Sequence, residues 1–332
     1  MNYDNRKLSL SLKSNTLSKE KTILLIPIYN DWESLKILIS NLAPLLQNSS
    51  TQYELLIADD GSLVKGPIPT LPGLPVQILK LHRNVGHQKA IAIGLAYIHH
   101  HMPSNSVLIM DGDGEDRPED ASALLSASAQ HPGKIVFAHR SSRTEPFLFR
   151  LFYSFYKFLF RFLTGKKIAY GNFMLLPGAV LNTLVYHNEI WNHLSAAIIK
   201  GGFPFVSIQT TRGKRYAGNS NMSFTGLLLH GFGALSVFIE QMASRLLLIS
   251  VTLMTISFIA ICVILGIRWF TDLAIPGWAS TIMSSMLIVL LQSILLSLFT
   301  LFLFLSSQSN RKFIPALHYN DYTAGTENPN HG

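Results

Sequence analysis

The sequence has few charged residues and almost no cysteine. Charged side chains make up 14% of the 332 residues, against about 25% in an average soluble domain, and the mean hydropathy is +0.28. The one cysteine, Cys262, excludes an internal disulfide and a cysteine-based metal site. The scarcity of charge predicts that part of the chain is not ordinary water-facing surface.

Acidic residues are scarcer than basic ones, with 19 Asp and Glu against 27 Lys and Arg. The resulting net charge of +8 favours an anionic partner, such as nucleic acid, a membrane surface or a phosphorylated substrate. No basic stripe with stacking aromatics occurs outside the membrane-proximal part, so we expect no nucleic-acid partner. Neither GxGxxG nor GxxxxGK[ST] occurs, which excludes a dinucleotide-binding fingerprint and a P-loop ATPase.

Two long segments contain no charged residue, namely residues 246–267 and 273–310, the second being most apolar at residues 283–305. Each exceeds the ~20 residues that cross a bilayer as a helix. The alternative is a pair of buried core helices, but core helices rarely run this long without a charge. The sequence therefore predicts a transmembrane hairpin with a short connecting loop around Trp269.

Basic residues gather on the outer flanks of this hairpin: Arg212, Lys214, Arg215 and Arg245 precede it and Arg311 and Lys312 follow it, while the loop has only Arg268. The positive-inside rule predicts an integral membrane protein with the domain before the hairpin and both termini in the cytoplasm. The expected organisation is a flexible tail at residues 1–20, an α/β domain at 21–210, a juxtamembrane segment at 211–245, two transmembrane helices at 246–310 and a cytoplasmic tail at 311–332.

The segment at residues 147–162 is rich in phenylalanine and carries Arg150, Lys157 and Arg161. This pattern is compatible with a buried helix and equally with a helix lying in the membrane interface. Because charge remains scarce even without the hairpin, residues 147–162 and 222–245 are candidates for membrane-facing surface.

Residues 21–210 alternate short apolar runs with amphipathic stretches, which predicts strands joined by helices around a mostly parallel, Rossmann-like sheet. We expect strands at residues 22–27, 53–58, 76–81 and 106–110, and helices at residues 31–46 and 90–101. Polar clusters follow several of these strands, beginning at Asn30, Asp59 and Asp111. Since ligands bind at the carboxyl ends of parallel strands, the clusters predict one crevice.

The last of these clusters is acidic, with Asp111, Asp113, Glu115 and Asp116 around Gly112 and Gly114. Carboxylates on one turn suit Mg²⁺ or Mn²⁺, which typically complete their coordination with substrate phosphates. A solvated acidic turn is the alternative.

Arg83 and Gly86 to Lys89 follow the third strand and open a helix, whose free N–H groups favour a phosphate.

The sequence contains four motifs in the order and spacing of family 2 glycosyltransferases: Ile26-Pro27-Ile28-Tyr29-Asn30-Asp31, Asp59-Asp60-Gly61-Ser62, Arg83-Asn84-x-Gly86-His87-Gln88 and Asp111-x-Asp113-x-x-Asp116-x-Pro118-Glu119. It most resembles the dolichol/undecaprenyl-phosphate glycosyltransferase branch, which includes enzymes with a C-terminal helical pair. The resemblance covers roughly residues 21–245 and implies a GT-A fold, a nucleotide-sugar donor of the UDP type, a divalent metal and transfer with inversion. It also implies a catalytic domain on the cytoplasmic side of a bacterial inner membrane or equivalent.

The resemblance also implies roles for individual residues. Donor contacts are expected from Pro27, Tyr29, Asp31, Asp59, Asp60, Arg83, Gly86, His87, Asp111 and Gly112. Metal contacts are expected from Asp111, Asp113 and Glu115, and catalytic roles from Asp113 and Asp116. Acceptor contacts are expected from Asn172, Arg212, Arg215 and Ser220, and His193 is a candidate base on the acceptor side.

Two residues depart from the family pattern: Asn172 replaces an Asp and Asn221 replaces a Lys. An amide cannot take a proton at neutral pH, so Asn172 is not a general base. A phosphate acceptor needs no base because its second pKa of about 6 leaves it largely dianionic. We expect a polyprenyl-phosphate acceptor, with a hydroxyl of a lipid-linked saccharide and a non-catalytic membrane scaffold as alternatives. A homo-oligomer is compatible with the sequence.

Overall fold

A computed structural model of the protein describes residues 20–47, 51–64, 66, 73–140, 147–167, 170–217, 224–271, 277–309 and 313–329. Three of the sequence-based predictions lie outside these residues. They are the tail at residues 1–19, the acceptor residue Ser220 and the flanking charges Arg311 and Lys312.

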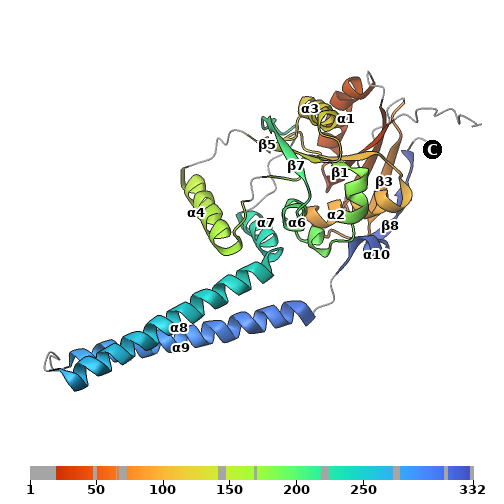
Figure 1. The fold of residues 1–332 in the computed structure, drawn as a ribbon. Coiled ribbons are helices and arrows are strands. Elements are labelled where there is room, and N and C mark those ends of the chain that lie inside the picture. The colour runs from red at the N-terminus through yellow and green to blue at the C-terminus, as the bar shows by residue number, and fades with distance from the viewer. Residues whose placement is uncertain are drawn as a thin grey trace, which may run out of the picture.

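One mixed sheet forms the centre of the N-terminal domain (Figure 1). Its strands are β1 (Lys21–Ile28), β2 (Gln52–Asp59), β3 (Val76–Leu81), β4 (Ser106–Ile109), β5 (Ile135–Arg140), β6 (Met174–Pro177), β7 (Phe205–Thr210) and β8 (Thr323–Glu327), in the spatial order β7-β5-β6-β4-β1-β2-β3-β8. The four expected strands are β1 to β4, which pair in parallel and start and end within a residue of the predicted bounds. Antiparallel pairing occurs where β6 meets β4 and β5, and where β8 meets β3.

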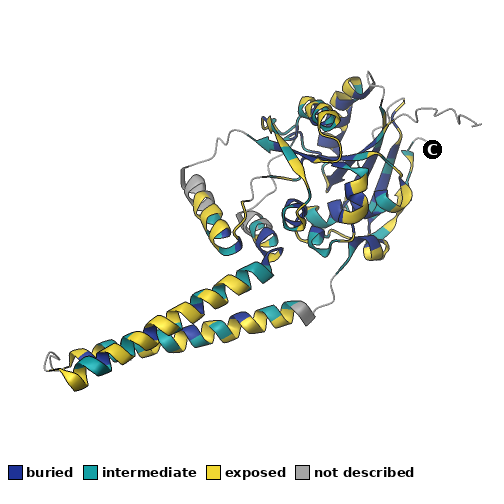
Figure 2. Ribbon diagram, viewed as in Figure 1, coloured by how far each residue is buried: buried dark blue, intermediate teal, exposed yellow. Residues whose placement is uncertain are grey.

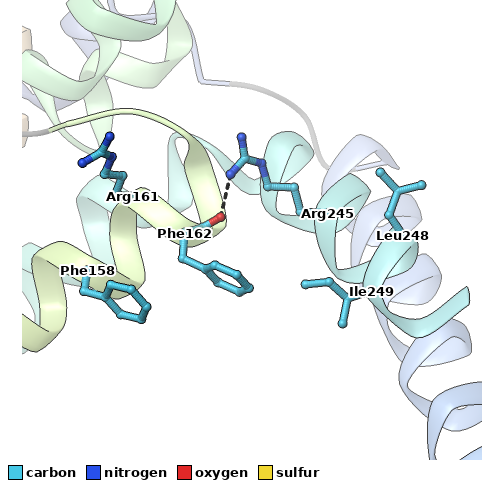
Figure 3. A pocket seen from close by; sticks show the side chains of 6 residues that line it. All are labelled: Phe158, Arg161, Phe162, Arg245, Leu248 and Ile249. Atoms are coloured by element: carbon cyan, nitrogen blue, oxygen red, sulfur yellow. Dashed lines mark hydrogen bonds between the residues drawn. The ribbon is translucent and has the colours of Figure 1, made fainter. Parts of the chain in front are cut away.

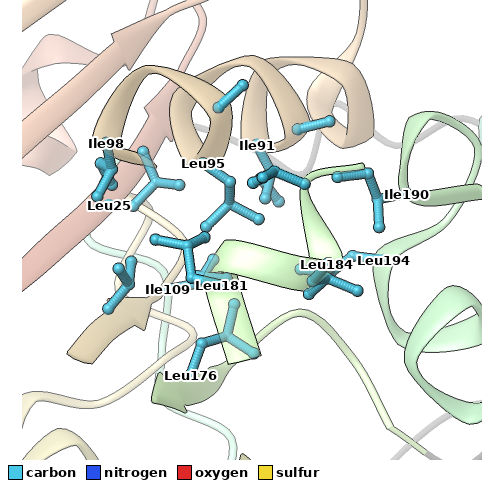
Figure 4. Close-up of a cluster of buried hydrophobic side chains, with 14 of the residues drawn as sticks. Leu25, Ile91, Leu95, Ile98, Ile109, Leu176, Leu181, Leu184, Ile190 and Leu194 are labelled. Atoms are coloured by element: carbon cyan, nitrogen blue, oxygen red, sulfur yellow. The ribbon is translucent and has the colours of Figure 1, made fainter. Parts of the chain in front are cut away.

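Helices cover both faces of the sheet because its central strands are apolar on both sides. They are α1 (Trp32–Gln47), α2 (His87–His101), α3 (Pro118–Gln130), α5 (Gly178–Leu184), η1 (Asn188–Trp191) and α6 (Leu194–Gly201). Alternate residues of β1 point to opposite faces, so Leu25 packs with α2 while Leu24 packs with α1. Each face of the sheet therefore has its own hydrophobic core. Figure 4 shows the core on the α2 face, in which Leu25 and Ile109 of the sheet meet Ile91 and Leu95 of α2.

The remaining helices lie beside this domain (Figure 1). They are α4 (Phe147–Thr164), α7 (Phe224–Ser236), α8 (Ile239–Phe270) and α9 (Trp278–Ser309). Helices α8 and α9 run side by side away from the sheet, and most of their apolar side chains are exposed (Figure 2). Only 17% and 11% of their most apolar windows are buried. This exposure contradicts the alternative of core helices, and both helices are long and apolar enough to cross a membrane.

The aromatic segment at residues 147–162 forms α4, whose phenylalanines are largely exposed. Phe155 and Phe158 are 62% and 67% exposed, whereas Phe160 packs against Phe238 at the start of α8. A helix buried in the domain core is therefore excluded for the described part of α4.

The C-terminal residues do not form the separate tail that we expected for residues 311–332. After α9 the chain returns to the domain through α10 (Pro315–His318) and η2 (Tyr319–Tyr322), and β8 joins the edge of the sheet beside β3. Hydrogen bonds from α2 hold this segment: His100 Nε2 lies 2.8 Å from the Ala316 carbonyl, and His101 Nε2 lies 2.7 Å from the Tyr319 hydroxyl. The prediction failed because a five-residue polar strand has no periodic signal until a sheet edge is there to pair with it.

Candidate active site

The polar clusters that follow β1 and β2 meet at one edge of the sheet, as expected. The Asp60 N–H donates to the Ile28 carbonyl at 2.9 Å, and the Asn30 N–H donates to the Ser62 hydroxyl at 2.9 Å. Asn30 also accepts hydrogen bonds from two N–H groups after Ser62. Because β1 and β2 are parallel neighbours, their carboxyl ends and the turns after them lie together.

Asp60 holds the turn that precedes α2. Its buried carboxylate accepts hydrogen bonds from the N–H groups of Val85 and Gly86, at 2.7 and 2.9 Å. Burial raises the pKa of Asp60, and these backbone donors oppose that rise. The structure therefore shows Asp60 organising the segment that presents His87, and direct contact between Asp60 and a nucleoside stays a prediction.

Gly61 lets the turn at Asp60 pack against the backbone of Arg83 and Asn84, just before α2. Its φ of +71° suits glycine, and a Cβ built there would lie 2.6 Å from the Arg83 carbonyl carbon. An Asp-Gly dipeptide is common in ordinary turns and by itself says little about function. Here the close approach to Arg83 explains why glycine follows Asp60.

The acidic turn after β4 is held by hydrogen bonds within itself. The Asp111 N–H donates to the Asp116 carboxylate, and the Glu115 N–H donates to Asp113 Oδ1, both at 2.9 Å. Asp116 is only 2% exposed and also accepts from Arg140 at 2.9 Å. Burial and the nearby Asp111 charge raise the pKa of Asp116 to about 7, against the opposing effect of Arg140. This position suits Asp116 for shaping the turn, and its expected catalytic role stays a prediction.

Cations from distant parts of the chain neutralise this turn. Arg140, at the end of β5, pairs with Asp116 and Glu115. Arg212 pairs with Glu115 at 2.6 Å, and Arg215 lies 3.2 Å from Asp113 and 2.8 Å from Asp31. The sequence near the turn does not reveal these partners, because the compensating arginines lie 24 to 102 residues away from it along the chain.

The segment after β7 lies across the acidic turn. The Gly213 N–H donates to the Glu115 carbonyl and the Tyr216 N–H donates to the Asp113 carbonyl, each at 2.9 Å. The Tyr216 ring fills the space over Gly114, where a Cβ would lie 2.5 Å from the ring. Arg212 and Arg215, expected at the acceptor phosphate, are bonded to carboxylates in this structure, and their contact with a phosphate stays a prediction.

His87 at the start of α2 connects the two halves of the site. Its Nε2 lies 3.1 Å from Asp111 Oδ1. Loss of water around the ring lowers the pKa of His87. The carboxylates of Asp111, Asp116 and Asp113 outweigh this effect and raise the pKa above its ordinary value. A protonated imidazole beside the N-terminus of a helix is suited to an anionic ligand.

The donor set fits a divalent cation that also binds substrate. Asp111 and Asp113 supply the hard carboxylate oxygens that Mg²⁺ and Mn²⁺ prefer. Within the described residues, no three candidate side chains form a complete ligand group, so phosphate oxygens of a substrate would have to complete the coordination. Glu115, expected as a third ligand, is paired with Arg212 and Arg140, as Asp113 is with Arg215, so its contact with a metal stays a prediction.

The residues expected on the acceptor side are only partly brought to this edge. His193 is 3% exposed, and its Nδ1 accepts a hydrogen bond from the Ala196 N–H, capping α6. A ring buried in this way cannot take a proton from a substrate in this conformation, so its expected role as a base is corrected to a helix cap. Asn172 Oδ1 is buried and accepts no hydrogen bond within the described residues, and its contact with an acceptor stays a prediction.

Sequence reasoning missed Arg140 and Tyr216. Arg140 belongs to no motif, and Tyr216 follows Arg215 at a position to which the sequence assigned no role. Only a surplus of acids at a strand end hinted that basic partners were needed. Pro27, Tyr29 and Gly112 lie at the carboxyl ends of β1 and β4, where the sequence placed them, and Tyr29 is 40% exposed. Their contacts with a donor stay predictions.

Comparison with known proteins places the chain in a family. The sequence model of Glycosyl transferase family 2 matches residues 23–188, which is half of the chain. The uncharacterized glycosyltransferase YkcC of Bacillus subtilis is 24% identical over 278 residues, covering 80% of this chain and 82% of that protein. The undecaprenyl-phosphate 4-deoxy-4-formamido-L-arabinose transferase of Sodalis glossinidius is 30% identical over 33% of this chain and 34% of its own length.

Among solved structures, glucosyl-3-phosphoglycerate synthase from Mycobacterium tuberculosis, in complex with Mn²⁺, UDP-glucose and phosphoglyceric acid, aligns over 68% of this chain and 80% of that chain. The alignment has a TM-score of 0.49 and 12% identity. The family match and the acidic strand-end site argue against the non-catalytic scaffold. The chain belongs to glycosyl transferase family 2 and is a glycosyltransferase with a GT-A type α/β domain.

Proposed function

We propose that the protein transfers a sugar, with inversion, from a UDP-linked donor to a polyprenyl phosphate at the membrane surface, for the synthesis of a cell-surface glycan or glycolipid. The observation that carries this proposal is the meeting of three polar strand ends at one sheet edge, in a chain that also has two exposed apolar helices. The named undecaprenyl-phosphate transferase among the relatives supports this acceptor class.

The donor diphosphate binds between the acidic turn and the start of α2. Asp111 and Asp113 would hold Mg²⁺ or Mn²⁺, which would supply positive charge near the diphosphate. His87 and the free N–H groups at the start of α2 bind phosphate oxygens, and Asp60 keeps that segment in place. Tyr29, Asp31 and Asp59 contact the nucleoside.

The acceptor needs no general base in this scheme. A phosphate monoester is mostly dianionic at pH 7, so its oxygen can attack the sugar carbon directly. This agrees with an amide at Asn172 and with the burial of His193. Arg212 and Arg215 exchange their carboxylate partners for the phosphates of donor and acceptor, and the membrane helices keep the lipid acceptor near them.

The test uses the full-length protein in detergent with labelled UDP-sugars, Mn²⁺ and undecaprenyl phosphate. We expect a lipid-linked monophosphosugar that mild acid cleaves. Asp113→Asn should lower turnover by about two orders of magnitude or more, because a metal-binding carboxylate is lost. Asp321→Asn, which changes an exposed carboxylate of η2, is the matched control. Full turnover in Asp113→Asn contradicts the site, and an acid-stable product contradicts the phosphate acceptor.

A further inference from the structure

A hollow lies between α4 and α8, away from the acidic turn. Its volume is about 570 Å³, within the range of small-molecule sites. It is lined by Phe158, Arg161 and Phe162 of α4 and by Arg245, Leu248 and Ile249 of α8. Figure 3 shows the two arginines on one side of the opening and the two phenylalanine rings with Ile249 on the other.

The charged side of the hollow is positive without an acidic partner from its own helices. Arg245 donates one hydrogen bond to the Phe162 carbonyl at 2.6 Å, which fixes its guanidinium at the end of α4 and leaves its other donors available. Arg161 forms no ion pair within the described residues. Helix α4 has no acidic residue, and the one in α8, Glu240, lies 3.8 Å from Lys200.

The other side of the hollow is apolar and exposed. The Phe158 and Phe162 rings are stacked with centroids 6.3 Å apart, and the side chains are 67% and 51% exposed. Leu248 is also 67% exposed. Arg245 directly precedes the uncharged stretch of α8, so the hollow lies where that helix passes from the domain into its apolar span. Arginines with aromatic neighbours at this level are typical of the headgroup region.

We propose that this hollow binds the phosphate group of an anionic glycerophospholipid of the bilayer. The guanidinium groups of Arg161 and Arg245 hold the phosphate, and an acyl chain lies against Phe162 and Ile249. Arginine suits this role because its planar fork makes two parallel hydrogen bonds to phosphate oxygens. The bound lipid joins α4 to α8 and holds the domain against the membrane surface.

A bilayer lipid fits this place better than the reacting acceptor. The acceptor phosphate has to meet the sugar at the acidic turn, yet none of the six lining residues is bonded to Asp111, Asp113 or Glu115. The lipid in the hollow is therefore a resident ligand that does not react, and this proposal goes beyond the transferase activity.

The test is native mass spectrometry of the full-length protein incubated in detergent with phosphatidylglycerol or phosphatidylcholine, without donor. We expect the protein to retain one phosphatidylglycerol and no phosphatidylcholine. Arg161→Gln should lower this retention about tenfold, and Arg161→Lys should lower it less because the charge remains. Arg268→Gln, at the far end of α8, is the matched control and should retain the lipid fully.

Three results would overturn the proposal: equal retention of both phospholipids, unchanged retention in Arg161→Gln, or displacement of phosphatidylglycerol by an equal amount of undecaprenyl phosphate. The last would make the hollow an acceptor site. Because no donor is present, retention of the lipid is measured whether or not the transferase proposal holds.

Discussion

At the scale of single residues, Arg215 shows how the site is balanced before a substrate binds. Its guanidinium lies between Asp31 and Asp113, one of the two carboxylates proposed to hold the metal. Both partners are about four-fifths buried, so the attraction is only partly screened by water. We therefore expect Arg215 to compete with a divalent cation for Asp113 while the donor is absent.

Replacing this arginine should strengthen metal binding by the donor-free protein. We expect Arg215→Met to raise the affinity for Mn²⁺ about tenfold, or about 1.4 kcal/mol, because Asp113 loses its competing partner. Calorimetric titration with Mn²⁺ alone measures this. Lys214→Met removes the same charge from the same segment and should leave the affinity nearly unchanged. Equal or weaker binding in Arg215→Met would show that Arg215 does not compete.

Gly61 provides a second test at this scale. Gly61→Ala adds a methyl group against the Arg83 backbone at a positive φ, so the segment that Asp60 orders must move. We expect a loss of about 1–3 kcal/mol in the free energy of unfolding and weaker UDP binding. Gly73→Ala carries a similar φ of +83° with open space around it and reports the backbone strain alone. If both variants lose the same stability and bind UDP equally, the contact with Arg83 has no role.

At the scale of elements, the C-terminal segment closes one edge of the sheet. Strand β8 pairs with β3, and Lys80 forms an ion pair with Glu327 across the two strands. An unpaired β3 would expose its backbone N–H and C=O groups to water. The sheet thus uses residues that come after the membrane helices to protect a strand that comes long before them.

Truncation after Tyr322 tests this protection. We expect the loss of β8 to speed amide hydrogen exchange at Val76–Leu81 and to lower stability by about 1–3 kcal/mol, since each ladder hydrogen bond contributes about 1 kcal/mol net. Truncation after Pro329 keeps β8 and serves as the control. Unchanged exchange in β3 after the longer truncation would contradict a stabilising role for β8.

An ion pair between η1 and α6 makes the stability of the fold depend on pH. Glu189 Oε1 lies 2.9 Å from Lys200 Nζ. Burial would raise the pKa of Glu189, but the hydrogen bond and charge of Lys200 lower it below its ordinary value of 4.5. A lowered folded pKa stabilises the fold above the unfolded pKa, and that contribution is lost as the pH falls through the folded pKa.

Thermal unfolding between pH 6 and pH 3 measures this contribution. The wild type should be more stable than Glu189→Gln at pH 6, by about 1 kcal/mol, and the difference should shrink as the solution is acidified below about pH 4.5. A difference that stays constant over this range would mean that the ionised form of Glu189 does not matter to the fold.

At the scale of the whole molecule, the pairing of β8 with β3 constrains the membrane topology. The domain before α8 and the strand after α9 belong to one sheet, so both ends of the helical hairpin lie on the same side of any membrane it crosses. We propose that this side is the cytoplasm, in line with the basic flanks of the hairpin.

Labelling of single cysteines tests this orientation. In a Cys262→Ala background, Thr271→Cys at the loop end of α8 should react with a membrane-impermeant maleimide added to intact cells. Thr323→Cys in β8 should react only after the membrane is broken. The reverse pattern would overturn the cytoplasmic assignment, and labelling of both positions in intact cells would contradict a membrane-spanning hairpin.

The sequence by itself predicted the central strands, the polar clusters at their ends and the two apolar helices. These features are local, because a strand buried on both faces is a continuous apolar run and a membrane span is a long uncharged one. Motif order then indicated the family before any contact was known. Burial of His193 and the partners of Glu115 were beyond this reasoning, since burial depends on which distant surfaces meet.

Only the tertiary structure decided how the acidic turn is balanced and how the chain ends. Arg140 and Arg215 reach the turn from separate strand ends, so their roles depend on sheet order, which no short pattern records. β8 needs the free edge of β3 to become a strand at all. Local periodicity determines what an element is, but ion pairs and edge pairing arise between residues far apart in sequence, and these follow only from the folded arrangement.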